Sequence, residues 1–151
     1  MLSLNKLIGE LAAGFTLEER IALLGAIREL ACVDGNFDLI EKIGLESTAG
    51  LLFTDCGADQ SALAGLEGID PLTVFHDPEK QLVVMEMLCF TALSDSSIHP
   101  REAEFIAEYA RTWGFDLARL RRLSCFDPLT LLDQGLSESG DALLDELSRL
   151  L

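Results

Sequence analysis

Basic and metal-binding side chains are scarce in this chain of 151 residues, and their scarcity argues against several functions. Eleven lysines and arginines stand against 26 aspartates and glutamates, so the formal net charge is −15. A charge of this sign repels phosphate backbones, which argues against nucleic-acid binding. Only two histidines are present, and the four cysteines are dispersed without a Cys-x-x-Cys pair. Zinc fingers and dithiol redox motifs are therefore not expected.

Long apolar runs are also missing. No stretch approaches the ~18 consecutive apolar residues that a membrane-spanning helix needs. The first residues lack the charged segment, apolar block and small-residue cleavage site of a secretory leader. These absences predict a cytoplasmic protein without an integral membrane segment, for which peripheral association with a membrane would go through partners.

Signatures of catalysis are absent as well. No glycine-rich phosphate loop follows a strand, and no serine or cysteine lies in a recognisable nucleophile context. The two histidines, His76 and His99, share no motif. Carboxylates are abundant enough for acid–base chemistry, but nothing in the pattern defines a substrate pocket. We therefore expect a protein that is not an enzyme.

Apolar residues, by contrast, are plentiful and follow a helical period. They make up 49% of the chain, and folding at this length buries roughly 68–70% of the unfolded surface. Apolar spacings of three and four residues, bounded by caps, glycines and prolines, predict helices and no strand. The expected helices cover residues 2–14, 17–33, 39–53, 60–66, 71–75, 78–94, 100–113, 116–123, 127–132 and 139–150. The helix over 78–94 is apolar almost all round, which predicts a central, buried position.

An acidic turn occurs twice, at a constant offset of 61 residues. In this alignment Asp34 falls on Asp95, and Glu41 falls on Glu102. A helix precedes each copy and another follows it, so the repeated unit is helix, acidic turn, helix. The sequence therefore predicts an all-α, single-domain bundle of about seven to nine helices built on two related helix-turn-helix repeats. We divide residues 1–151 into repeat one (17–53), a connector (54–77), repeat two (78–115) and C-terminal helices (116–151).

Helix capping explains much of each turn. Asp38 and His99 stand where an N-cap belongs, and Pro100 suits the first helical position. Glu41 and Glu102 follow three residues after the cap, as in a capping box. Capping does not account for Asp34 and Asp95, which precede the second helix of each repeat.

These same residues resemble the TerB tellurite-resistance family. The resemblance is carried by Asp34, Gly35, Phe37 and Glu41 in the first copy and by the closing Gly114-Phe115-Asp116. In the second copy it is carried by Asp95, Ile98 and Glu102, whereas Ser96 stands in place of the glycine. It covers roughly residues 17–123. The family implies calcium binding and a role in a tellurite or envelope stress response. The tail beyond Leu123 lies outside the resemblance, and it can pack on the bundle or act as an interaction helix.

The residues themselves also suit a hard cation, since calcium takes six to eight oxygen ligands in loose geometry. Asp34, Asp38 and Glu41 supply three carboxylates around one loop, whereas Asp95 and Glu102 supply two. A single loop is short of ligands, so the expected site is weak unless the two loops converge, and the first copy should dominate.

Two functions remain open on these grounds. The first is a non-enzymatic, TerB-like accessory or sensor module that binds calcium and works through protein partners. The second is a helical protein-interaction scaffold without an ion site, in which the acidic turns serve only as helix caps. We also expect Cys32 and Cys89, which lie within apolar helical runs, to be buried free thiols.

Overall fold

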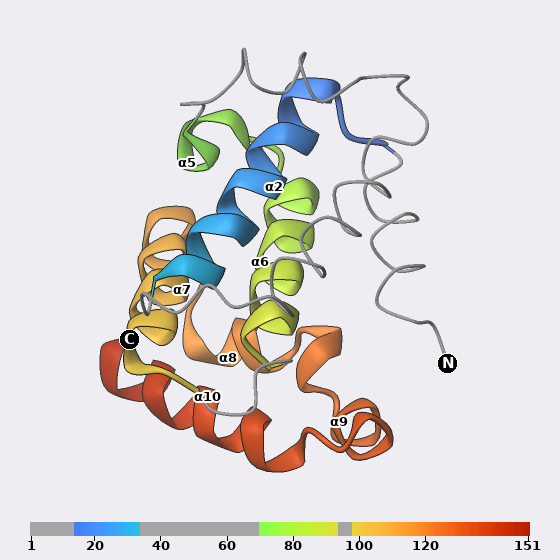
Figure 1. The fold of residues 1–151 in the computed structure, drawn as a ribbon, viewed down its shortest axis with the longest axis vertical. Coiled ribbons are helices and arrows are strands. Elements are labelled where there is room, and N and C mark those ends of the chain that lie inside the picture. The colour runs from blue at the N-terminus through green and yellow to red at the C-terminus, as the bar shows by residue number, and fades with distance from the viewer. Residues whose placement is uncertain (1–13, 34–69, 94–97) are drawn as a thin grey trace.

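The structure is a computed structural model, and it describes residues 14–33, 70–93 and 98–151 (Figure 1). Every regular element within these ranges is a helix, so the predicted all-α class is confirmed. None of the described helices is long and apolar enough to cross a membrane. The elements are α2 (Leu17–Cys32), α5 (Pro71–Val74), α6 (Pro78–Leu93), α7 (Pro100–Trp113), α8 (Leu117–Arg121), the 3₁₀ helix η2 (Ser124–Phe126), α9 (Pro128–Gln134) and α10 (Ser137–Leu150).

Helices α2 and α6 pack side by side and run in the same direction (Figure 1). They start 61 residues apart, at 17 and 78, and end 61 apart, at 32 and 93. Near their N-termini the Nζ of Lys80 lies 2.8 Å from Oε1 of Glu19, and these two positions are also 61 apart. The first helices of the two predicted repeats are thus equal in length and in contact at an equivalent position.

Each of these helices begins at the cap that the sequence predicts. Thr16 and Glu19 form a capping box before α2, in which the Thr16 N–H donates to the Glu19 carboxylate over 2.8 Å. The Glu19 N–H in turn donates to the Thr16 hydroxyl over 3.2 Å. At α6 the Asp77 carboxylate accepts from the Glu79 N–H at 2.9 Å, and Pro78 occupies the first turn. These bonds satisfy helix-start N–H groups that have no partner within the helix.

The predicted central position of α6 is confirmed. Its residues 84–89, 92 and 93 are all buried. Helix α2 covers one side of α6, α7 packs beside it, and η2 and α10 contact it from the C-terminal part of the chain. Since neighbours lie on most sides, a nearly continuous apolar surface is the pattern such a helix needs.

Helix α7 returns antiparallel to α6 (Figure 1). Gly114 ends it in a left-handed conformation at φ +75°, which favours glycine. The side facing the bundle is buried, through Ala103, Ile106, Tyr109 and Ala110. The described helices therefore support the up-and-down arrangement expected of a helix-turn-helix unit.

The C-terminal helices pack on the bundle. Helix α10 crosses one end of it and contacts α6, α7, α8 and α9 (Figure 1). Its last turn is held by Arg111, whose guanidinium donates to the Leu150 carbonyl over 3.0 Å. At Gly140 an added Cβ would come within 2.7 Å of Leu131, so α10 and α9 approach closely there.

Several expectations fall on residues outside the described ranges. These are the opening helix over 2–14, the second helix of repeat one over 39–53 and the short helix over 60–66. The superposition of the two helix pairs therefore stays a prediction, although α2 and α6 have equivalent bounds.

Candidate functional site

A chain of five aromatic rings joins the residue before Thr16, the cap of α2, through the end of α5 to helix α7. Phe15 contacts Phe75 at 5.4 Å between centroids, and Phe75 meets Trp113 edge-on at 6.2 Å. Trp113 then packs edge-on against Tyr109 at 5.2 Å, and Tyr109 stacks with Phe105 at 5.0 Å. Rings at these separations attract one another beyond simple burial. The last ring, Phe105, is only half-buried.

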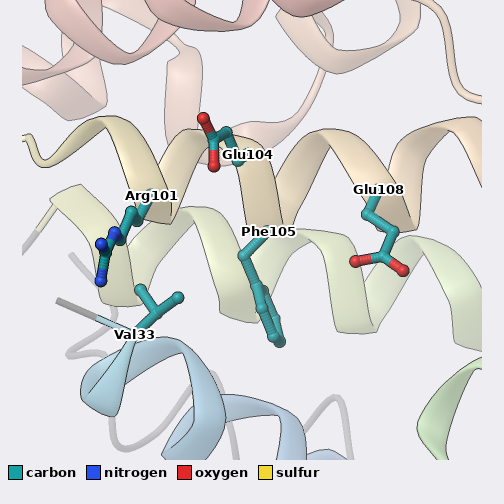
Figure 2. A pocket seen from close by; sticks show the side chains of 5 residues that line it. All are labelled: Val33, Arg101, Glu104, Phe105 and Glu108. Atoms are coloured by element: carbon teal, nitrogen blue, oxygen red, sulfur yellow. The ribbon is translucent and has the colours of Figure 1, made fainter. Parts of the chain in front are cut away.

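Phe105 lines a groove of about 300 Å³ between α7 and the end of α2 (Figure 2). The other described residues that line it are Val33, Arg101, Glu104 and Glu108. Figure 2 shows Arg101 and Phe105 extending from α7 toward Val33, whereas Glu104 extends away from α2. The groove thus has an apolar side and charged residues along its length.

Three carboxylates act on Tyr109, the ring on which Phe105 stacks. Burial is the main cause that raises the pKa of Tyr109 above its usual range, and the charges of Glu29, Asp70 and Glu108 raise it further. These three carboxylates come from α2, from the residue before α5 and from α7. None of the three forms an ion pair with another described residue. In the groove itself Glu108 lies at one end and Arg101 at the other (Figure 2).

Of the five predicted calcium ligands, only Glu102 is among the described residues. Asp34, Asp38, Glu41 and Asp95 lie outside them. Glu102 is buried, at 5% exposure, in the first turn of α7. Arg101, which precedes Glu102 in the chain, lines the groove described above. Val33, which precedes Asp34, lines the same groove.

The predicted cap at the start of α7 is present. His99 Nδ1 accepts a hydrogen bond from the Arg101 N–H over 3.2 Å, and Pro100 follows at the first helical position. The capping role assigned to His99 is thus confirmed for the second copy. No group of three His, Cys, Asp or Glu side chains that could hold a metal occurs within the described ranges.

One predicted thiol can be checked. Cys89 is a fully buried free cysteine, as expected, and so is Cys125. The two thiols are hydrogen-bonded, which together with burial raises the pKa of Cys125 far above its usual range. A thiol held in its neutral form is a poor nucleophile, so Cys125 is not an activated thiol. The side chain of Cys32 lies outside the description.

Phe105 and Glu108 were not among the residues predicted from sequence. The available signal is their spacing, because Arg101, Glu104, Phe105 and Glu108 share the helical face opposite the buried residues of α7. A half-buried aromatic flanked by charges on such a face is a hint of a binding surface.

Comparisons with protein-family models, with curated proteins and with solved structures find no match for this chain.

Proposed function

We propose that the protein is a non-enzymatic, TerB-like accessory or sensor module that binds calcium weakly at its acidic turns and acts through protein partners in a tellurite or envelope stress response. The observation that carries this proposal is that the two repeats approach each other at one groove. Val33 is bonded to Asp34 and Arg101 is bonded to Glu102, and both Val33 and Arg101 line the groove.

The parallel course of α2 and α6 supports the same idea. Both helices end on the same side of the bundle, and an acidic turn follows each one in sequence (Figure 1). Three carboxylates in the first turn are too few for calcium, which takes six to eight oxygens. Asp95 and Glu102 would raise the number of carboxylates to five, and backbone carbonyls and water would complete the shell.

The test is a calorimetric titration with calcium, joined to thermal unfolding with and without the ion. A ligand that binds only the folded chain adds about 1.4 kcal/mol of stability at ten times its Kd. Asp34→Asn keeps the shape of the side chain but removes its charge, so we expect a Kd roughly tenfold higher, or about 1.4 kcal/mol. Asp95→Asn should weaken binding less, since His99 replaces the Asp38 carboxylate in that copy.

The control is Glu138→Gln, at an exposed carboxylate on α10. It should leave calcium binding unchanged. Equal affinity in all four proteins, or no heat at millimolar calcium, would refute the ion site.

The second candidate function is a helical interaction scaffold without an ion site. The observation in its favour is the His99 cap, which gives the second turn a structural purpose that requires no ion. In this case calcium would leave the melting temperature unchanged, while the partner surface on the bundle would remain.

A further inference from the structure

Four residues of α7 form a stripe outside the core, whereas the opposite side of this helix is buried. Arg101, Glu104, Phe105 and Glu108 follow one another at spacings of three, one and three residues and line the groove. The stripe from 101 to 108 spans about 10 Å, at 1.5 Å per residue. An extended peptide rises about 3.3 Å per residue, so three residues of a partner would cover the stripe.

Charge is distributed unevenly along this stripe. Figure 2 shows Arg101 near Val33, whereas Glu108 lies at the other end of the stripe. Glu108 forms no ion pair with another described residue. A cationic side chain is the complementary occupant of that end.

The ring of Phe105 supplies the apolar part of the surface. It is half-buried, and its stacking on Tyr109 at 5.0 Å holds it in place. Because Tyr109 itself belongs to the chain of packed aromatic rings, the side chain of Phe105 is already restrained. Little side-chain entropy is therefore lost when a ligand contacts Phe105. An aromatic ring next to carboxylates attracts a lysine or arginine in two ways, through its methylene stem and through its charge.

We infer that this groove binds a segment of a partner protein that presents a lysine or arginine to the Glu108 end and an apolar side chain to Val33 and Phe105. The inference rests on the part of the proposed function that concerns protein partners, and it does not depend on calcium binding. The net charge of −15 disfavours anionic membrane surfaces and nucleic acids as occupants.

The experiment uses a fluorescent pool of end-blocked octapeptides, each with one leucine and two lysines among glycines and serines. A second pool carries glutamates in place of the lysines. Fluorescence polarisation with the full chain, in EDTA and at low ionic strength, should show saturable binding of the lysine pool only. Binding should weaken as salt is added, since exposed charges are screened.

Matched variants locate the site. Glu108→Gln should raise the Kd of the lysine pool about threefold, as expected for an exposed ion pair. Phe105→Leu keeps an apolar side chain at this position but removes the aromatic ring, and it should weaken binding by a similar factor. Glu138→Gln removes one exposed charge from α10 and should leave the Kd unchanged.

Three results would overturn the inference. These are equal binding of both pools, equal effects of Glu108→Gln and Glu138→Gln, and no saturation at millimolar peptide. Because EDTA removes calcium, these results concern the groove alone. The calcium titration of Asp34→Asn fails or succeeds independently of them.

Discussion

Helices α2 and α6 have equivalent bounds but different surroundings. At positions 61 residues apart, exposed Arg28 of α2 corresponds to fully buried Cys89 of α6. Exposed Glu29 likewise corresponds to half-buried Phe90. One helix of the pair leaves a charged face uncovered, whereas the other is enclosed.

The C-terminal part of the chain accounts for this difference. Buried Glu86 of α6 accepts the Ser124 N–H of η2 at 2.8 Å, and the thiol of Cys125 contacts that of Cys89. At the position equivalent to Glu86, α2 has Gly25, where an added Cβ would meet nothing within 4 Å. Two related helices thus acquire different roles from what packs on them, one as the core and one as part of an acidic surface.

The largest effect is expected when α6 receives the residue that α2 carries at the equivalent position. Cys89→Arg would bury a guanidinium at a site with 0% exposure, at a cost comparable to the whole stability of roughly 5–15 kcal/mol. We expect no cooperative unfolding transition and rapid proteolysis. The reverse change, Arg28→Cys, should alter the free energy of unfolding by less than about 0.5 kcal/mol. A folded Cys89→Arg protein would mean that α6 is not enclosed at this point.

A smaller effect is expected at the next equivalent pair. Glu86→Ala leaves the Ser124 N–H without its acceptor, which should cost about 2–3 kcal/mol because the lost bond is to a charged group. Gly25→Ala should instead stabilise by up to about 1 kcal/mol, since alanine is the better helix former and the added Cβ meets no atom within 4 Å. Urea denaturation measures both. If both substitutions changed the free energy of unfolding in the same direction, that result would contradict the conclusion that α6 is covered at this position and α2 is not.

The Lys80–Glu19 pair joins the two helices and should make stability depend on pH. Burial alone would raise the pKa of Glu19, but the hydrogen bonds from Lys80 and Thr16 and the Lys80 charge lower it below 4.5. The folded chain therefore binds this proton less readily than the unfolded chain. The resulting stability is present above the unfolded pKa and is lost as pH falls through the folded one.

Lys80→Met should accordingly cost about 1 kcal/mol at neutral pH and almost nothing once Glu19 is protonated. Unfolding in urea at neutral and at strongly acidic pH provides the measurement. The control is Arg149→Met, which removes a more exposed pair of 3.4 Å with Glu146 and should change stability by less than about 0.5 kcal/mol. A loss for Lys80→Met that is the same at both pH values would contradict the ion pair.

The smallest effect concerns the uncovered face of α2, where the charge of Glu29 acts on Tyr109. Tyr109 is the only tyrosine of the chain. Burial raises its pKa, and the charges of Glu29, Asp70 and Glu108 raise it further. In the folded chain its absorbance should not change near the usual value of about 10, whereas in urea it should titrate there. Since the folded pKa is the higher one, this contribution to stability is present below the unfolded pKa and declines as pH rises above it. If Tyr109 titrated at the same pH in the folded chain and in urea, that result would contradict its burial next to these carboxylates.

Helix bounds were largely predictable because their signals are local. Thr16, Asp77-Pro78 and His99-Pro100 mark helix starts, and Gly114 marks an end, through bonds to residues at most a few positions away. The predicted starts at 17, 78 and 100 match the structure. The start of α10 was placed two residues late, since Ser137 follows Leu136, which provides no side-chain cap.

The groove was less predictable. Phe105 and Glu108 stand on the helical face outside the core, and among the described residues Val33, from another helix, completes the groove there. The contact of Cys125 with Cys89 and the bond of Ser124 to Glu86 join residues more than 30 positions apart, so no local pattern indicates them. The proposed ligands Asp34, Asp38, Glu41 and Asp95 stay predictions because they lie outside the described residues.

By itself the sequence determined the all-α class, the helix starts and the buried character of α6, because caps and apolar periodicity act over a few residues. Only the tertiary structure decided which distant segments enclose α6 and where a groove forms beside α7. Those outcomes depend on which distant segments pack together, so that η2 covers α6 while the charged face of α2 stays in contact with solvent.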